Sequence, residues 1–193
     1  MSANAKSKIL STASQLFYAQ GYHQTGINQI IEESKVAKAS FYYHFASKED
    51  LAIAYLEATT ELLQTEMDEL LDTPGRPGNK ILQLFDRLYQ WQNDPGYHGC
   101  VFLKLSSEFE PGYPPVQERV IRSKQGFRQF LLLLIGQLEF APAVPLSPSL
   151  IADTLVTLFD GAATEALAVG DLWPIDGACK TVAALIGPQN LDL

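Results

Sequence analysis

The sequence has few cysteines and no long apolar run. Among its 193 residues only Cys100 and Cys179 are cysteines, too few for a disulfide-based fold and compatible with a reducing cytoplasm. No segment reaches the roughly 18 consecutive apolar residues that a membrane-spanning helix needs. The first residues also lack the apolar stretch of a signal peptide. These absences predict a cytoplasmic protein without a membrane partner, large enough for one or two small domains with a full core.

Side chains suited to catalysis are also scarce. The chain has three histidines, His23, His44 and His98, and an enzyme needs a base positioned beside a nucleophile or an acid. The run His98-Gly99-Cys100 brings a base near a thiol but has no third orienting residue. We find no metal-ligand spacing and no glycine-rich phosphate loop. We therefore expect no catalysis, no cofactor and no metal, with a helical enzyme using residues 91–130 as a distant alternative. Cys100 could be a redox sensor or, more commonly, a buried thiol.

Acidic residues outnumber basic ones, but the two signs are unevenly distributed. The net charge is −8. Residues 1–48 carry five lysines against Glu32 and Glu33, a charge of +3, whereas residues 49–193 carry nine Lys or Arg and twenty acids, a charge of −11. Phosphate binding needs basic side chains. A basic N-terminal head on an acidic body therefore predicts that one small module meets nucleic acid.

The most informative pattern lies at residues 25–51. Two short segments repeat apolar residues at helical spacing: Ile27, Ile30 and Ile31 in the first, and Phe41 and Phe45 in the second. Residues 34–37 interrupt the pattern, with Val36 as the apolar residue that can close the corner. The spacing predicts two short helices joined by a tight turn. The second helix, 38–44, would expose Lys, Ser, Tyr and His on one side, which suits the major groove of DNA.

These residues resemble the tetracycline-repressor-like (TetR) family of transcriptional regulators. The similarity runs from near Ile9 through LFYAQGYHQTGINQII to SFYYHFASKEDL, roughly the first quarter of the chain. Its most specific part is YYHF at 42–45, followed by SKEDL at 47–51. Two positions depart from the family pattern: Lys35 stands where a turn glycine is usual, and Ala37 where a capping Ser or Thr is common. A non-glycine residue in a left-handed turn costs about 1 kcal/mol, so the turn either tolerates that cost or has a different backbone.

The resemblance implies a set of DNA contacts. Base edges would be reached by Lys38, Ala39 and Ser40, where Lys favours guanine and Ala can touch a thymine methyl. Phosphates would be contacted by Thr25, Tyr42, Tyr43, His44 and Lys48. Lys35 adds a possible contact. Three positions have alternatives: Tyr42 could pack, Thr25 could cap a helix, and Asn28 could pair with adenine or face solvent.

The remaining sequence predicts helices separated by proline and glycine. The first, at 5–20, would end at Gly21, and a long helix at 48–71 would be capped by Ser47 with Asp50. Others are expected at 79–93, 99–109, 115–140, 148–169 and 175–187, where Ser147-Pro148 is a typical helix start. The predicted fold is all-α: an N-terminal three-helix helix-turn-helix head, residues 1–48, and a C-terminal helical-bundle body, residues 49–193.

The predicted body offers a ligand pocket and a dimer interface. Aromatic residues on successive helices could line an apolar cavity or form an ordinary core: Trp91, Phe102, Phe109, Phe127 and Phe130. The last two helices carry apolar faces interrupted by small residues, which predicts a four-helix interface between two subunits. The predicted interface residues are Leu155, Leu158, Phe159, Ala162, Ala163, Ala166, Ala183 and Ala184.

With the resemblance, these features predict a homodimeric transcriptional repressor that binds a palindromic operator in double-stranded DNA. A small apolar or amphipathic effector would release it by favouring a body conformation whose head spacing no longer fits the operator. The alternative is a DNA-binding regulator without a small-molecule ligand, constitutive or controlled by a protein partner. A ligand-induced change in operator affinity would distinguish the two.

Overall fold

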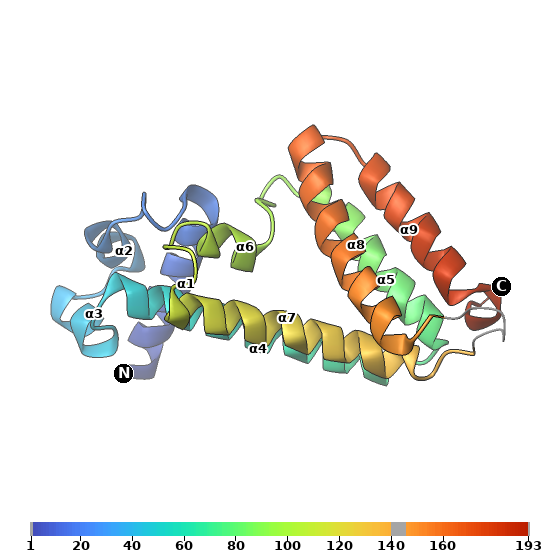
Figure 1. Cartoon of the computed structure of the whole chain (residues 1–193). Helices are drawn as coiled ribbons and strands as arrows, with labels where there is room; N and C mark the ends of the chain where they lie inside the picture. The colour runs from blue at the N-terminus through green and yellow to red at the C-terminus, as the bar shows by residue number, and fades with distance from the viewer. Residues whose placement is uncertain (1, 140–145, 193) are drawn as a thin grey trace. The chain divides into compact units, whose positions relative to one another are not determined.

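The computed structural model describes residues 2–139 and 146–192, and in these ranges it contains helices and turns but no strand (Figure 1). The helices are α1 (Ser2–Gln20), α2 (Ile27–Ser34), α3 (Lys38–His44), α4 (Lys48–Asp72), α5 (Pro77–Gln92), α6 (Val101–Ser106), α7 (Pro114–Ile135), α8 (Pro148–Val169), α9 (Trp173–Ile186) and the short 3-10 helix η1 (Pro188–Asn190). The all-α prediction is confirmed. Within the described ranges, no helix combines the length and apolar character that crossing a membrane requires.

Most helix boundaries follow the predicted caps. The α4 helix begins at Lys48, because Ser47 Oγ accepts a hydrogen bond from the Asp50 N–H at 3.0 Å and donates to Asp50 Oδ2 at 2.9 Å. The α8 helix has both predicted ends, with Ser147 Oγ accepting from Leu150 N–H at 3.2 Å. Two predicted helices are too long. The 99–109 segment is helical only in α6 and continues as turns, and the 115–140 segment ends at Ile135, before Gly136. Residue 140 lies outside the described residues.

The chain forms two compact units. The head unit comprises residues 1–62 and 101–123, and the body unit comprises residues 63–100 and 124–193. Both α4 and α7 therefore contribute to both units, and α6 belongs to the head unit although it follows α5 of the body unit in sequence. These units divide the chain at different places from the predicted boundary at residue 48. The predicted functional division, DNA binding before that residue and ligand binding after it, stays a prediction.

The head unit packs α1 against α2, α3 and α6. Its buried apolar residues come from every one of these helices and from the start of α4, and they include Ile9, Ala13, Phe17, Ile30, Phe41, Leu51, Leu56, Phe102 and Leu105. Burial of this apolar surface is the main force that holds two helices as short as α2 and α3 in place, since isolated helices of that length are marginal in water.

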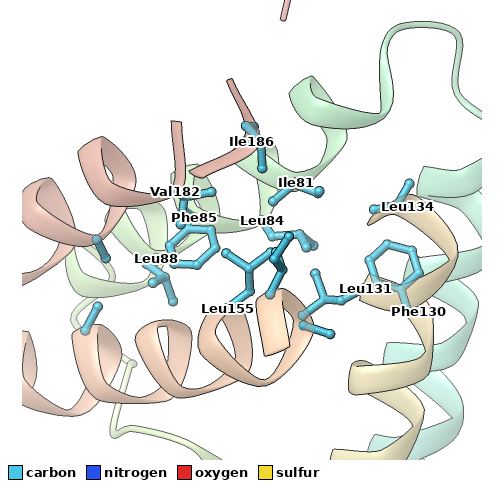
Figure 2. Packing of buried hydrophobic residues seen from close by; sticks show 14 of the residues in the cluster. Ile81, Leu84, Phe85, Leu88, Phe130, Leu131, Leu134, Leu155, Val182 and Ile186 are labelled. Carbon is cyan, nitrogen blue, oxygen red and sulfur yellow. The ribbon is translucent and has the colours of Figure 1, made fainter. Parts of the chain in front are cut away.

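The body unit packs α5, α8 and α9 around one apolar cluster, to which α7 adds a further set of side chains (Figure 2). Phe85 and Leu88 of α5 face Leu155 of α8 and Val182 of α9 within this cluster. The cluster explains why both α8 and α9 are strongly apolar in sequence.

The α8 face that we predicted to meet a second subunit packs instead inside the single chain. Leu155, Ala162, Ala163 and Ala166 are buried in the body core, and Leu158 and Phe159 pack against it. Of the α9 residues, Ala183 is half-buried and Ala184 is exposed. The prediction is therefore corrected for Leu155, Ala162, Ala163 and Ala166, because α5 and α9 cover that side of α8. For the half-buried Leu158 and Phe159, and for the two α9 residues, it stays a prediction.

The five aromatic residues predicted to line a pocket do not belong to one unit. Phe102 and Phe109 lie in the head unit, whereas Trp91, Phe127 and Phe130 lie in the body unit. In the body unit the ring of Phe159 makes three contacts, with centroid distances of 5.0 Å to Phe127, 5.5 Å to Phe85 and 6.0 Å to Trp91. We call Phe85, Trp91, Phe127 and Phe159 the body aromatic cluster.

Candidate nucleic-acid interface

The corner between α2 and α3 is fixed by two backbone hydrogen bonds. The Val36 N–H donates to Ile31 O at 3.4 Å, and the Lys35 N–H donates to Glu32 O at 3.2 Å. This pair of bonds defines a Schellman motif, which ends a helix by placing the next residue in the left-handed conformation. The motif turns the chain so that α3 starts two residues after Val36.

Lys35 occupies that left-handed position. Its φ and ψ are 55° and 40°, and among the described residues it is the one non-glycine residue with positive φ. The sequence allowed either a left-handed turn at a non-glycine residue or a different backbone. The structure has the left-handed turn, which destabilises the fold by about 1 kcal/mol relative to glycine. The side chain of Lys35 is exposed, so its charge remains at the surface beside α3.

The two faces of α3 differ as the sequence predicts. Phe41 and the following Phe45 are buried. Tyr42 and Tyr43 are 47% and 79% exposed, large values for aromatic side chains. Lys38 and Ala39 are also exposed, whereas Ser40 and His44 are half-buried, and Asn28 is exposed on α2. As expected from Ala37, no side chain caps the start of α3.

Thr25 does not reach the surface. Its exposed fraction is 0%, and its hydroxyl donates to Gly21 O at 2.7 Å and accepts from Gln20 Nε2 at 3.2 Å. The N-cap of α2 is Gly26, without a side-chain hydrogen bond. Neither a phosphate contact nor a cap fits this placement. The predicted role of Thr25 is corrected: its hydroxyl closes the turn between α1 and α2.

Lys48 holds the same turn from the start of α4. Its Nζ donates to Tyr22 O at 3.0 Å and to Thr25 O at 3.1 Å, and lies 4.2 Å from the centroid of the Tyr22 ring. Burial lowers the pKa of Lys48, while the nearby Glu108 carboxylate acts to raise it. Since an ammonium has three donors, one N–H is left for the predicted phosphate contact.

Residues 101–123 make contacts with residues 1–62 of the head unit that the sequence pattern did not predict. Lys104 donates to the backbone carbonyl of Tyr18. The Tyr113 hydroxyl donates to Glu49, and this hydrogen bond raises the pKa of Tyr113. Arg119 pairs with Glu57 at 2.9 Å. Each partner lies more than sixty positions away in sequence, so no local spacing rule could have identified these pairs.

The exposed side of α3 is rich in hydrogen-bond donors. One face of α3 presents an ammonium, hydroxyls and an imidazole, all donors that can meet phosphate oxygens or base edges. In the described part of the chain, no three or more His, Cys, Asp or Glu side chains gather where they could hold a metal ion.

Residues 9–55, which run from within α1 to the first turns of α4, match the family model of bacterial regulatory proteins of the tetR family. The chain belongs to the TetR family. Among curated relatives, it is 38% identical over 108 residues to YxaF of Bacillus subtilis (strain 168), an HTH-type transcriptional regulator, covering 54% of this chain and 56% of YxaF. It is 40% identical over 79 residues to the HTH-type transcriptional regulator LmrA of the same strain, covering 40% of this chain and 42% of LmrA.

The chain thus spans about half the length of these two curated relatives. The fold of the TetR chain is also similar to that of Escherichia coli NemR in its reduced form. The TM-score is 0.85 over 95% of this chain and 97% of the NemR chain, at 24% sequence identity.

Proposed function

We propose that this TetR-family protein is a homodimeric transcriptional repressor that binds operator DNA through α2 and α3. The observation that supports this function best is the exposure of Tyr42 and Tyr43 on a helix whose opposite side is buried. The tyrosine side chains combine apolar area with a hydroxyl donor, so covering them with DNA removes apolar surface from water and gives each hydroxyl a phosphate partner. Exposed Lys38 on the same helix adds a positive charge to this surface.

The residues on α3 divide into two groups by their expected contacts. Lys38, Ala39 and Ser40 lie on the first turn of α3, and the N-terminal part of such a helix meets base edges. Tyr42, Tyr43 and His44 follow and would contact phosphates, as would Lys35 and the remaining donor of Lys48. Phosphate contacts fix the position of the protein on the duplex, and base contacts select the sequence.

The proposed dimer uses the outward faces of α8 and α9. On α8 the exposed residues Thr157, Gly161 and Thr164 are small and uncharged, and on α9 Gly177 and Ala184 are exposed. Small side chains let helices from two subunits approach closely around a two-fold axis. These residues take the place of Leu155, Ala162, Ala163 and Ala166, which are buried within the chain.

The proposed effector site lies at the body aromatic cluster. Phe159, at its centre, is followed on α8 by Asp160, which forms a half-buried ion pair with Lys124 at 2.6 Å. Aromatic walls with one polar pair beside them suit an apolar or amphipathic small molecule, since most of its surface would be buried and a few polar groups would fix its orientation. Binding there would favour a conformation with lower operator affinity.

The decisive experiment selects DNA from a genomic pool with the purified protein and then measures operator affinity by fluorescence anisotropy. We expect a palindromic consensus, and Tyr43→Ala should bind it more weakly than Ile121→Ala, which truncates another exposed side chain of the head unit. Failure to enrich any sequence contradicts the proposed function.

To test the effector site, a panel of aromatic amphiphiles is added to the complex of protein and operator. Release by one of them that Phe159→Ala prevents supports the effector site, whereas DNA binding that no compound changes favours control by a protein partner.

A further inference from the structure

The turn between α1 and α2 binds a carboxylate that comes from a distant part of the chain. Glu108 Oε1 accepts a hydrogen bond from the Tyr22 N–H at 2.8 Å, and Oε2 accepts from the His23 N–H at 2.7 Å. Glu108 follows α6 and lies 86 residues after Tyr22. Successive backbone N–H groups that point to one side form a concave site for an anion, and here the anion is a side chain of the same head unit.

Gly21 makes room for this carboxylate. Its φ is +97°, a left-handed value that residues with a Cβ rarely adopt. A Cβ at Gly21 would lie 3.1 Å from Glu108 Oε1 and 3.3 Å from Oε2, closer than ordinary van der Waals contact. Glycine thus suits the positive φ of the turn, and a Cβ there would push the Glu108 carboxylate away by a few tenths of an ångström.

The rest of the turn is held from its carbonyl side. Lys48 Nζ donates to Tyr22 O and Thr25 O, while Glu108 takes the N–H groups of Tyr22 and His23. The His23 ring Nε2 lies 2.6 Å from Glu108 O and donates to it in the tautomer that carries that proton. The Tyr22 ring packs on Phe109 with a centroid distance of 4.6 Å. The turn is therefore fixed on both sides directly before α2.

We propose that Glu108 is a positioning residue for DNA binding: its carboxylate fixes the α1–α2 turn and thereby sets where α2 and α3 meet the operator. This inference rests on the proposed DNA-binding function. Glu108 contributes no contact to DNA. It acts through the Tyr22 and His23 N–H groups, because a turn that loses them is free to adopt conformations in which α2 starts in a different place.

Charge alone predicts the opposite effect from positioning. A carboxylate in a DNA-binding head repels phosphate, so replacing it with a neutral group should strengthen binding slightly. Glu110 provides the matched control, since it is exposed and lies two residues further along the chain. Glu110→Gln removes one negative charge without touching the turn. Glu108→Gln removes the same charge but can accept only one of the two N–H bonds, because its NH₂ group is a donor.

The test measures operator affinity and backbone amide signals for the full chain. We expect Glu108→Gln to bind about tenfold more weakly, in line with the loss of a hydrogen bond to a charged group, and Glu110→Gln to bind as tightly as wild type or slightly more tightly. The operator consensus should be unchanged, because the α3 side chains are the same. In nitrogen-15 NMR spectra, the Tyr22 and His23 amide protons should move upfield in Glu108→Gln and stay in place in Glu110→Gln.

A Glu108→Gln protein that binds at wild-type affinity or better overturns the inference, as do unmoved Tyr22 and His23 amide signals. Glu108→Asp is a second variant for the case in which Glu108→Gln fails to fold, because it keeps the negative charge and withdraws the carboxylate by one methylene from the Tyr22 and His23 N–H groups. It should also bind the operator more weakly than wild type, and wild-type affinity in this variant would contradict the inference. If the wild-type protein selects no DNA, the proposed function fails, while the amide signals still report on the carboxylate site.

Discussion

Replacing Lys35 with glycine should make the protein more stable and a weaker DNA binder. Lys35 lies at φ 55° and ψ 40°, and this left-handed conformation costs a residue with a Cβ roughly 1–2 kcal/mol. Glycine removes the cost, although its greater freedom in the unfolded chain offsets about 0.4–1 kcal/mol. The expected net gain in the free energy of unfolding is therefore about 0.5–1 kcal/mol.

The control for this substitution is Lys35→Ala. Alanine keeps the Cβ and the strain, so its free energy of unfolding should stay within about 0.5 kcal/mol of wild type. Both variants lose the same charge, and both should reduce the slope of log affinity against log salt by about 0.9 if Lys35 contacts one phosphate. Urea denaturation followed by circular dichroism gives the stability, and anisotropy at several salt concentrations gives the slope.

Two results would refute this reasoning separately. If Lys35→Gly is no more stable than Lys35→Ala, the left-handed conformation carries no cost at this turn. If the salt slope is the same in wild type and both variants, Lys35 makes no phosphate contact. The strain and the charge are thus measured independently at one position.

The other predictions concern the dimer, base selection and the α1–α2 turn. Gly161→Glu on the outward face of α8, where a Cβ meets open space, should sediment as a folded monomer, because an unpaired carboxylate in an interface costs several kcal/mol if it stays ionised. Gln90→Glu, exposed on α5, should stay dimeric, and a dimeric Gly161→Glu would place the interface elsewhere. Ala162→Glu should instead lose helical circular dichroism, because Ala162 is buried in the core. Lys38→Ala should change base preference at one operator position by about 1–3 kcal/mol, and an unchanged consensus in selection would remove Lys38 from base readout. Lys48→Met should lower the urea midpoint, because two backbone carbonyls lose a charged donor, and a midpoint equal to wild type would contradict that role.

The sequence predicted the local features of the head well because they depend on short spacings. The burial of Phe41 and Phe45 and the exposure of Tyr43 follow from helical periodicity, and Ser47 and Asp50 form the predicted cap. These patterns involve only residues within one or two turns of a helix, so they can be recognised from one sequence without knowledge of tertiary contacts.

The missed features depend on the tertiary fold. The α8 helix is apolar on more than one side, so periodicity could not say which face meets the chain's own core and which is left for a partner. Thr25 is a residue type that can cap, bind phosphate or close a turn, and only burial separates these roles. Glu108 gave no signal at all, because its two N–H partners lie more than eighty residues away.

The discontinuity of the head unit has a consequence for exchanging parts between regulators. A chimera that joins residues 1–62 to the body of another protein would leave behind Lys104, Glu108 and Tyr113, each of which bonds to that segment. The transplanted residues 1–62 would then depend on the side chains that the recipient protein has at the corresponding positions. A chimera that also includes residues 101–123 keeps those partners. In this protein the exchangeable DNA-binding unit therefore consists of two segments, residues 1–62 and 101–123.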